Sequence, residues 1–426
     1  MRDPDPAPPD PRSTLHAPRS TPHRPTILFV AEAVTLAHVA RPLVLAGGLD
    51  PGRFKVVFAV DPRYEAMVRG HPFEFRPIRS IPPAQFLAAL ADGRPVYDFP
   101  TLSSYVADDL ALLDAVRPDV VVGDFRLSLS ASTRLGKVPC LTITNAYWSP
   151  FAPARFPLPE LPMSRALGVS AASLLFRVAR PIAFALHSRP LDRVRKAHGL
   201  PGLGFDLRRA YTDADQTLYA DAAELVPTHA LPPTHHYLGP LVWSPPVEPP
   251  SWWGEIPDDR PIVYATLGSS GRAGLLDAVL TALADLPVTV LAATAGKDAG
   301  AHPPSNARTA PFLPGADAAR RASLVVCNGG SPTAHQALAA GTPVLGLPSN
   351  LDQHLNMEGI VARGAGLVVR SEHARPAAIR AAVARMLADG SFRREAGAVA
   401  AIFARYDAAG RFRAILDRVI PSGRPA

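Results

Sequence analysis

The sequence predicts an α/β protein made of two doubly wound, Rossmann-like domains that face a cleft. Short β-branched runs of strand length alternate with helix-like segments, a pattern typical of a parallel sheet covered by helices on both faces. At 426 residues the chain is long for one hydrophobic core and fits two domains of ordinary size. A Pro-rich stretch separates two halves of similar pattern. We therefore expect a disordered tail at 1–25, an N-terminal domain at 26–240, a linker at 241–256, a C-terminal domain at 257–391 and C-terminal helices at 392–426.

The first half alternates regularly up to residue 144. Strands are expected at Thr26–Ala31, 54–60, 73–77, 119–124 and Cys140–Thr144, with closing strands at 216–220 and 236–238. Helices are expected at 39–47, 65–70, 105–116 and from residue 128. A loop at 32–36 leads to His38, just before the first of these helices.

Segment 151–207 breaks this alternation. It begins Pro-rich and then becomes apolar, with arginines spaced along it. The pattern favours two packing helices divided at Pro181. The alternative is that these helices form the wall of an apolar cleft or touch a membrane surface.

The second half repeats the alternation. Strands are expected at 261–267, 288–293, 309–313, Leu324–Cys327 and 342–348, with helices at 275–284, 332–340 and 392–420. Asp352 and Gln353 are expected on the loop after the last of these strands.

Composition restricts the class of protein. The apolar fraction of 47% suits a globular chain. No uninterrupted apolar run of about eighteen residues occurs, and the first two dozen residues lack the apolar segment of a secretory signal. Net charge is +7, yet no basic block interleaved with aromatic residues occurs, so no nucleic-acid partner is expected. Cys140 and Cys327 lie in apolar runs, as reduced core residues of a cytoplasmic enzyme would.

Residues 324–346 carry the most informative local pattern. A buried strand is followed by Asn328-Gly329-Gly330-Ser331 and then by a helix that Gly341 ends. Glycines allow close approach of the backbone, and the free N–H groups of a helix start attract negative charge. The pattern therefore indicates a phosphate site, although a plain strand-to-helix turn would explain the glycines equally well.

Residues 324–370 as a whole resemble the donor-binding signature of inverting nucleotide-sugar glycosyltransferases of GT-B fold. This family includes plant natural-product UDP-glycosyltransferases and bacterial macrolide glycosyltransferases. The residues that match it with the spacing intact are Gly330, Thr333, Gly341, Pro343, Asp352, Gln353 and Asn356. Two positions depart from the family pattern. Asn328 replaces a His that donates to the donor diphosphate, and Gln336 replaces a Glu that accepts from the ribose. Asn and Gln keep a donor and an acceptor, but each loses charge assistance of about 1–2 kcal/mol.

The resemblance implies a metal-independent hexosyltransferase without a cofactor, which takes a UDP- or dTDP-sugar as donor and a small hydroxyl compound as acceptor. It implies that the N-terminal domain binds the acceptor, that the C-terminal domain binds the sugar nucleotide, and that the last helix packs back on the first domain. The implied donor-binding residues are Gly268, Ser269, Phe312, Asn328, Gly329, Gly330, Ser331, Thr333, Gln336, Asp352 and Gln353. Phe312 would lie under the nucleotide base, although a residue preceding Pro314 could equally belong to the core.

His38 and Asp124 are the candidate catalytic pair. His38 follows the first strand and Asp124 ends the fourth, so a parallel sheet would place both at its carboxyl edge. The resemblance implies that His38 is the base and that Asp124 orients it. Ala37 replaces the family's Gly before the His, and Pro42 lies one residue later than usual. A surface His and a helix-capping Asp are the alternative.

Two other polar clusters are weaker candidates. Asp213-Ala214-Asp215 resembles a metal-binding motif but precedes a strand of the first domain, so we expect no metal there. His235 and His236 are expected to be a solvated loop pair without a third ligand.

For function, we expect transfer with inversion to a small, apolar acceptor, without membrane contact. The alternatives are a transferase for a lipid-linked acceptor at a membrane surface and a sugar-nucleotide-binding protein without turnover. Asn328 and Gln336 motivate the last of these.

Overall fold

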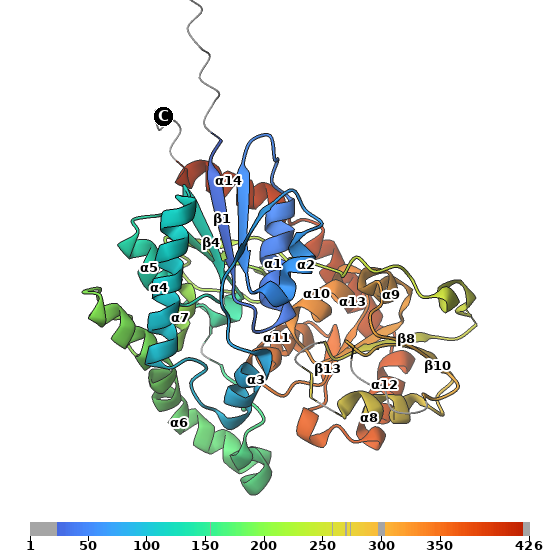
Figure 1. The fold of residues 1–426 in the computed structure, drawn as a ribbon. Coiled ribbons are helices and arrows are strands. Elements are labelled where there is room, and N and C mark those ends of the chain that lie inside the picture. Colours follow the sequence, from blue (N-terminus) through green and yellow to red (C-terminus); the bar gives the residue numbers. More distant parts are fainter. Residues whose placement is uncertain are drawn as a thin grey trace, which may run out of the picture.

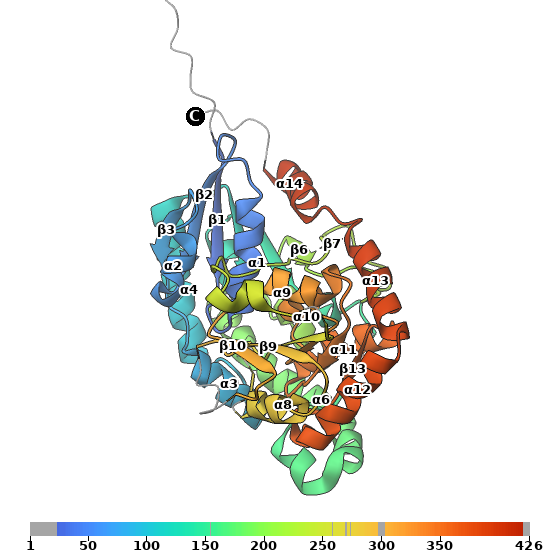
Figure 2. The same ribbon diagram turned by 90° about the vertical axis from the view of Figure 1, so that its right-hand side faces the viewer.

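The computed structural model describes residues 24–153, 155–257, 259–268, 271–272, 274–296 and 303–420. Two parallel sheets, each flanked by helices, form two domains that lie side by side (Figures 1 and 2). The predicted fold class is confirmed. All but the last two residues of the predicted tail lie outside the described residues.

The first sheet has the strand order β3-β2-β1-β4-β5-β6-β7, and every pairing is parallel. Its strands are β1 (Thr26–Ala31), β2 (Lys55–Val60), β3 (Glu74–Pro77), β4 (Val120–Asp124), β5 (Cys140–Thr144), β6 (Gln216–Tyr219) and β7 (His235–Tyr237). Its helices are α1 (Leu36–Gly47), α2 (Glu65–Val68), α3 (Pro83–Asp92), α4 (Phe99–Val116), α5 (Leu129–Leu135), α6 (Pro162–Ala197) and α7 (Leu207–Thr212). The apolar runs predict these strands to within one or two residues because β1, β4 and β5 are almost wholly buried.

The second sheet has the order β10-β9-β8-β11-β12-β13, again with parallel pairings. Its strands are β8 (Ile262–Thr266), β9 (Thr289–Ala293), β10 (Ala307–Ala310), β11 (Leu324–Cys327), β12 (Val344–Gly346) and β13 (Gly366–Val368). Its helices are α8 (Leu275–Leu283), α9 (Gly315–Arg321), α10 (Ser331–Ala339), α11 (Leu351–Ala362) and α12 (Pro376–Ala388), followed by α13 (Ser391–Phe403) and α14 (Ala408–Val419).

Both sheets change winding direction at one point, and these two points position the site. In the first sheet β1 lies between β2 and β4, and in the second β8 lies between β9 and β11. Connections leave such neighbouring strands in opposite directions, which opens a crevice at their carboxyl ends. His38 follows β1 and Asp124 ends β4, whereas Gly268 follows β8 and Asn328 follows β11.

The C-terminal segment, expected to be helical over 392–420, forms two helices with a break between Phe403 and Ala408. Ala396, Val399 and Phe403 of α13 belong to the core of the second domain. Phe412, Ile415 and Leu416 of α14 belong to the core of the first domain, next to β1. The break lets the chain return to the first domain, so the predicted return of the last helix holds for α14 alone (Figure 1).

Two further expectations about the elements were wrong. The strand expected at 309–313 is β10, which ends at Ala310 and leaves Phe312 beyond the sheet. The proline at 181 does not divide α6, which continues through Pro181 on an exposed face where solvent can hydrate the carbonyl that proline leaves unpaired. The non-helical residue is instead Gly168, at φ 75° and ψ 161°, a conformation that favours glycine.

Both cysteines are buried and free, as expected for core residues. Burial raises the pKa of each thiol to about 12. Neither thiol is therefore a nucleophile near neutral pH.

Candidate active site

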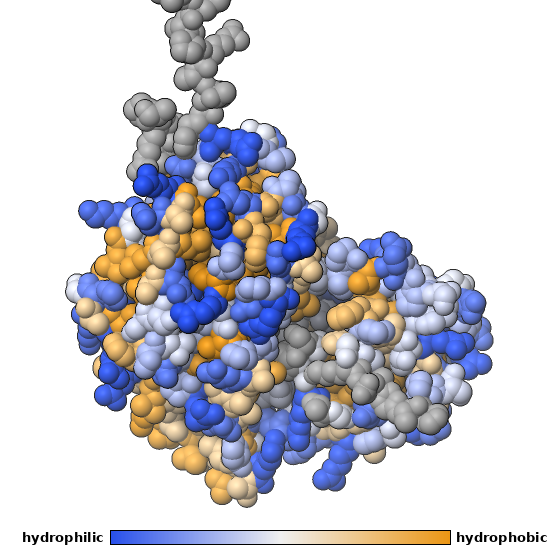
Figure 3. Space-filling view, in the orientation of Figure 1, coloured by the Kyte–Doolittle hydropathy of each residue, from blue (hydrophilic) through white to orange (hydrophobic). Residues whose placement is uncertain are grey.

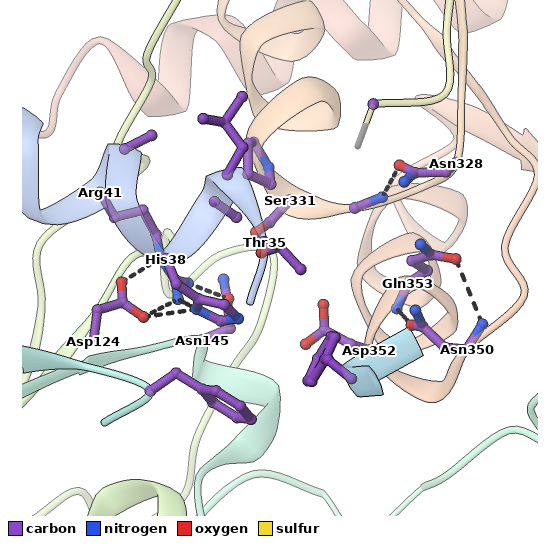
Figure 4. Close-up of a pocket in the computed structure, with 18 of the residues that line it drawn as sticks. Thr35, His38, Arg41, Asp124, Asn145, Asn328, Ser331, Asn350, Asp352 and Gln353 are labelled. Atoms are coloured by element: carbon purple, nitrogen blue, oxygen red, sulfur yellow. Dashed lines mark hydrogen bonds and ion pairs between the residues drawn. The ribbon is translucent and has the colours of Figure 1, made fainter. Parts of the chain in front are cut away.

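A cavity of about 1130 Å³ lies between the two domains and receives side chains from both. His38 and Asp124 lie on one side of it, and Asn328, Asp352 and Gln353 lie on the other (Figure 4). The carboxyl ends of both sheets and the Pro-rich connector, through Trp243, Pro245 and Val247, contribute to its lining. The structure thus brings together residues from opposite halves of the sequence, such as His38 and Gln353.

His38 lies in the first turn of α1, not on a loop before it as expected. Its Nδ1 atom is 2.8 Å from Oδ1 of Asp124. Its ring stacks on Phe125, with centroids 4.7 Å apart and an interplanar angle of 14°. These two contacts fix the ring, and Nε2 is the nitrogen left for a ligand in the cavity. The surface-His alternative is wrong, because the side chain is 17% exposed and lines the cavity.

Asp124 is fully buried and binds a second partner that the sequence did not reveal. Arg41, one turn after His38 on α1, donates from Nε to Oδ2 at 2.8 Å and from a terminal nitrogen to Oδ1 at 2.7 Å. Asp124 therefore forms a two-pronged ion pair and is not a helix cap. The available signal was an arginine within the apolar run Val39–Ala46, three residues from His38 and so on the same helical face.

The Nδ1 atom of His38 is close to two groups of opposite character. Arg41 approaches it at 3.0 Å and can only donate, whereas Asp124 can only accept. The two contacts thus correspond to alternative tautomers. Donation to Asp124 leaves the lone pair on Nε2, which is the tautomer of a general base.

Contacts continue from Arg41 across to the second domain. Arg41 donates to Oδ1 of Asn145 at 2.7 Å, and Nδ2 of Asn145 reaches both oxygens of Asp221 at 3.1 and 3.2 Å. Nε2 of His335, on α10, lies 3.7 Å from Asp221. Burial raises the pKa of Asp221 to about 6 and lowers that of His335 to about 4.

The glycine turn before α10 has the geometry of an anion cradle. Gly329 adopts φ 82°, and a Cβ atom there would lie 2.8 Å from Cγ of Met357, so both its conformation and its packing require glycine. Asn356 donates to the Gly329 carbonyl at 2.8 Å and holds the turn from α11. Gly330, Ser331 and Thr333 line the cavity, whereas Gly329 lies behind them and shapes the turn.

Asn328 and Gln336, the two residues that depart from the family pattern, each already have a hydrogen-bond partner. Oδ1 of Asn328 accepts from the Gly330 N–H at 3.0 Å. Nε2 of Gln336 donates to the Trp243 carbonyl at 3.0 Å, which ties α10 to the connector between the domains. Both residues line the cavity.

Asp352 and Gln353 lie in the first turn of α11, not on a loop. Asn350 and Gln353 form a reciprocal capping box, a signal that the sequence contained. Oδ1 of Asp352 accepts from Trp148 Nε1 at 2.8 Å and from the Tyr147 hydroxyl at 3.1 Å, both in the first domain. The pair lines the cavity, and Asp352 also connects the domains.

Of the three remaining donor candidates, two line the cavity and one lies outside the described residues. Gly268, at φ 61°, lines the cavity. Ser269 lies outside the described residues. Phe312 lines the cavity and is 47% exposed, which excludes the alternative of a core residue and leaves its ring available for stacking.

The acidic motif and the histidine pair have structural partners. Asp213 pairs with Arg134 and Arg195 at 2.9 and 2.8 Å, and Asp215 accepts from the Cys140 N–H at 2.8 Å. Within the described residues, no group of three or more His, Cys, Asp or Glu side chains is placed to hold a metal ion. The expected solvated loop at 235–236 is wrong, because both histidines belong to β7 and are half-buried.

Helix α6 forms one wall of the cavity. Phe176, Ala179, Ala183, Phe184 and His187 of this helix line it, at a spacing that marks one helical face. Of the two readings of segment 151–207, the apolar wall is therefore the one that the structure supports.

Known proteins resemble this chain along most of its length. The family model described as "Erythromycin biosynthesis protein CIII-like, C-terminal domain" matches residues 275–405. A PGL/p-HBAD biosynthesis glycosyltransferase of Mycobacterium tuberculosis (strain ATCC 25177 / H37Ra) is 54% identical over 387 residues, which cover 91% of this chain and 90% of the relative. A PGL/p-HBAD biosynthesis rhamnosyltransferase of Mycobacterium bovis (strain BCG / Pasteur 1173P2) is 50% identical over 411 residues, covering 96% and 91%.

A solved structure shows the same fold at lower identity. The spinosyn rhamnosyltransferase SpnG complexed with thymidine diphosphate aligns with a TM-score of 0.64 at 20% identity, covering 92% of this chain and 100% of that one.

Proposed function

The chain belongs to the family of PGL/p-HBAD biosynthesis glycosyltransferases, and from this premise we propose that it moves a hexose from a UDP- or dTDP-sugar to a hydroxyl of an apolar acceptor with inversion. The observation that carries the proposal is the pairing of His38 with Asp124 at 2.8 Å, across one cavity from the glycine turn of α10. A base and a diphosphate site that face each other from two domains suit a single displacement.

His38 takes the proton of the acceptor hydroxyl on Nε2 as the oxygen attacks the anomeric carbon. Asp124 holds the ring through Nδ1 and stabilises the imidazolium that forms. The bond to the diphosphate breaks on the opposite side of the sugar. The attack from the first domain and the departure towards the second therefore invert the anomeric configuration.

The departing diphosphate is held by neutral donors and by the start of α10. The N–H groups of this nine-residue helix have no side-chain cap, and Ser331 and Thr333 add hydroxyl groups at the cavity. These groups stabilise negative charge without a metal, which supports the proposal of a metal-independent transfer. Phe312 offers its exposed ring to the nucleotide base.

For the donor, we favour a thymidine diphosphate 6-deoxyhexose. One relative is named a rhamnosyltransferase, and the solved rhamnosyltransferase of the same fold carries thymidine diphosphate in its name. UDP-hexoses remain the comparison donors in the test below.

For the acceptor, we favour a phenol, because its hydroxyl suits the proposed base and its ring suits the apolar wall of the cavity. A phenolic hydroxyl has an ordinary pKa of about 10, so its proton passes to an imidazole more easily than that of an aliphatic alcohol. The apolar wall of α6 suits such a ring.

The test compares His38→Ala with wild type in transfer from dTDP-rhamnose and UDP-glucose to a simple phenol, read by mass shift. We expect kcat to fall roughly 10²- to 10⁴-fold, the usual contribution of a general base, with binding of the nucleotide retained. His229→Ala, at an exposed histidine away from the cavity, is the matched control and should keep full activity. Equal turnover in wild type and His38→Ala would refute the proposed base.

A second candidate function is binding of the sugar nucleotide without turnover. It is favoured by Asn328 and Gln336, which lack the charge of the residues that the family signature has there. Tight binding of dTDP to wild type without sugar transfer or hydrolysis, over a panel of phenols, would support it.

A further inference from the structure

Helix α6 exposes a strip of large apolar side chains to solvent. Leu174, Val178, Ile182 and Leu186 follow one another at intervals of four residues, with Leu175 beside them. Their exposed fractions are 66%, 71%, 66%, 51% and 48% for positions 174, 178, 182, 186 and 175. We call these five residues the outer face of α6. Figure 3 shows apolar surface gathered at the lower edge of the molecule, where α6 lies in Figure 1.

The opposite face of the same helix belongs to the active-site cavity. Phe176, Ala179, Ala183 and His187 line it and are offset from the outer face by about half a turn. One helix thus separates the acceptor cavity from the exposed apolar strip.

By length and composition α6 could also cross a membrane, and it is the one such helix in the described part of the chain. The sequence expectation of no spanning segment relied on uninterrupted apolar runs, which the arginines of α6 break. A spanning position would remove the wall of the cavity, because Phe176 and Phe184 are buried against the protein. A helix that is apolar outside and packed inside is instead suited to lie in a membrane interface.

The charges of α6 point to an anionic partner. Residues 162–191 contain four arginines, Arg165, Arg177, Arg180 and Arg189, and no Asp, Glu or Lys. Arg165 pairs with Glu160, and Arg180 lies over the ring of Phe156. Arg177 and Arg189 are exposed, and no ion pair to either occurs among the described residues. Apolar side chains flanked by arginines without acidic neighbours match the lipid tails and anionic headgroups of a bilayer.

We propose that the outer face of α6 docks on an anionic lipid bilayer, so that an acceptor with a lipid tail reaches His38 directly from the membrane. The proposal rests on the proposed transferase function and names its acceptor as membrane-borne. Leu174, Val178 and Ile182 enter the interfacial region of the bilayer, and Arg177 and Arg189 contact its headgroups. A bilayer needs no matched hydrogen bonds, which agrees with an outer face whose five members are all aliphatic.

The first test measures sedimentation of the full chain with vesicles of phosphatidylcholine, with and without phosphatidylglycerol. Wild type should bind vesicles that contain phosphatidylglycerol. Leu174→Gln, Val178→Gln and Ile182→Gln together should weaken that binding roughly a hundredfold, because each change removes an apolar side chain from the interface. Val361→Gln, at a 41% exposed position on α11, is the matched control and should bind like wild type.

The charge arm replaces Arg177 and Arg189 by Gln. Each change should weaken binding to phosphatidylglycerol vesicles about fivefold and leave the weaker binding to pure phosphatidylcholine unchanged. Arg308→Gln, at an exposed arginine of β10, is the control. Equal binding of wild type and both sets of variants would overturn the proposal, and so would a dimer of wild type that the outer-face variants abolish.

Transfer to a water-soluble phenol separates this proposal from the proposed function. The outer-face variants should keep that activity and lose activity on the same phenol carrying a long alkyl chain in vesicles. Activity on the soluble phenol without vesicle binding would refute the docking proposal alone. Vesicle binding without any sugar transfer would refute the transferase function alone.

Discussion

Arg41 offers the sharpest test of how the site is assembled. It donates three hydrogen bonds, two to Asp124 at 2.8 and 2.7 Å and one to Asn145 at 2.7 Å. Asp124 is fully buried, so Arg41→Met leaves its charge with His38 as the remaining side-chain partner. Breaking a buried ion pair on one side costs about 3–5 kcal/mol, and we expect the free energy of unfolding to fall by that amount.

A double-mutant cycle isolates the pair itself. Asp124→Asn alone leaves the buried guanidinium of Arg41 without its carboxylate and should lower the free energy of unfolding by a similar amount. Arg41→Met together with Asp124→Asn removes both charges. The loss in the double variant should therefore be smaller than the sum of the single losses by about 2–3 kcal/mol, measured by urea unfolding. Additive losses would refute the ion pair as described.

Activity gives a second readout of the same change. Without Arg41 the carboxylate of Asp124 keeps His38 as its remaining side-chain partner, so the imidazole ring is held less firmly and kcat should fall roughly tenfold to a hundredfold. Arg195→Met, which breaks the buried pair of Arg195 with Asp213, should lose stability and keep kcat. An unchanged kcat in Arg41→Met would show that Arg41 does not position the His38–Asp124 pair.

Two further predictions concern the contacts between the domains and the donor site. The pKa of Asp221 is raised from 3.8 to about 6, so its contribution to stability is lost as pH rises towards 6. The pKa of His335 is lowered from 6.5 to about 4, so its contribution to stability is lost as pH falls towards 4. The two effects oppose each other in wild type. Between pH 4 and 6 the free energy of unfolding of Asp221→Asn should therefore rise by about 3 kcal/mol relative to wild type, and that of His335→Gln should fall by as much. Parallel curves of unfolding free energy against pH in all three proteins would contradict this. Asn328→His should tighten dTDP binding, measured by calorimetry, about fivefold to thirtyfold. Gln336→Glu should weaken it, because a carboxylate would face the Trp243 carbonyl. Unchanged affinity in both variants would mean that neither side chain faces the donor.

The strands and the winding of both sheets could be predicted from the sequence, because a strand that is buried on both faces appears as a short, continuous apolar run. The ends of β1, β5 and β11 were predicted to the residue, since each is an apolar run bounded by polar residues or turns. His38 and Asp124 both follow strands at the carboxyl edge of one parallel sheet, and this position alone predicts that they lie close together.

What escaped prediction depends on partners that are distant in sequence. The apolar run around Arg41 indicates that this arginine is buried near His38, but not that its partner is Asp124, which lies 83 residues away. The sequence placed Gly329 in the glycine turn, but only its packing against Met357 shows that it shapes the turn rather than lining the cavity. The helical position of Asp352 could have been predicted, because Asn350 and Gln353 have the spacing of a capping box at a helix start.

Under the proposed function Asp352 recognises the sugar of the donor, and its hydrogen bonds limit how it can do so. Tyr147 and Trp148 both donate to Oδ1, so a hydroxyl of the donor would find its free acceptor at Oδ2. A hexose would then be gripped along one edge, in an orientation dictated partly by two aromatic residues of the opposite domain. Selectivity among sugars is in that sense a joint property of both lobes, and swapping the C-terminal lobe between relatives would not transplant it intact.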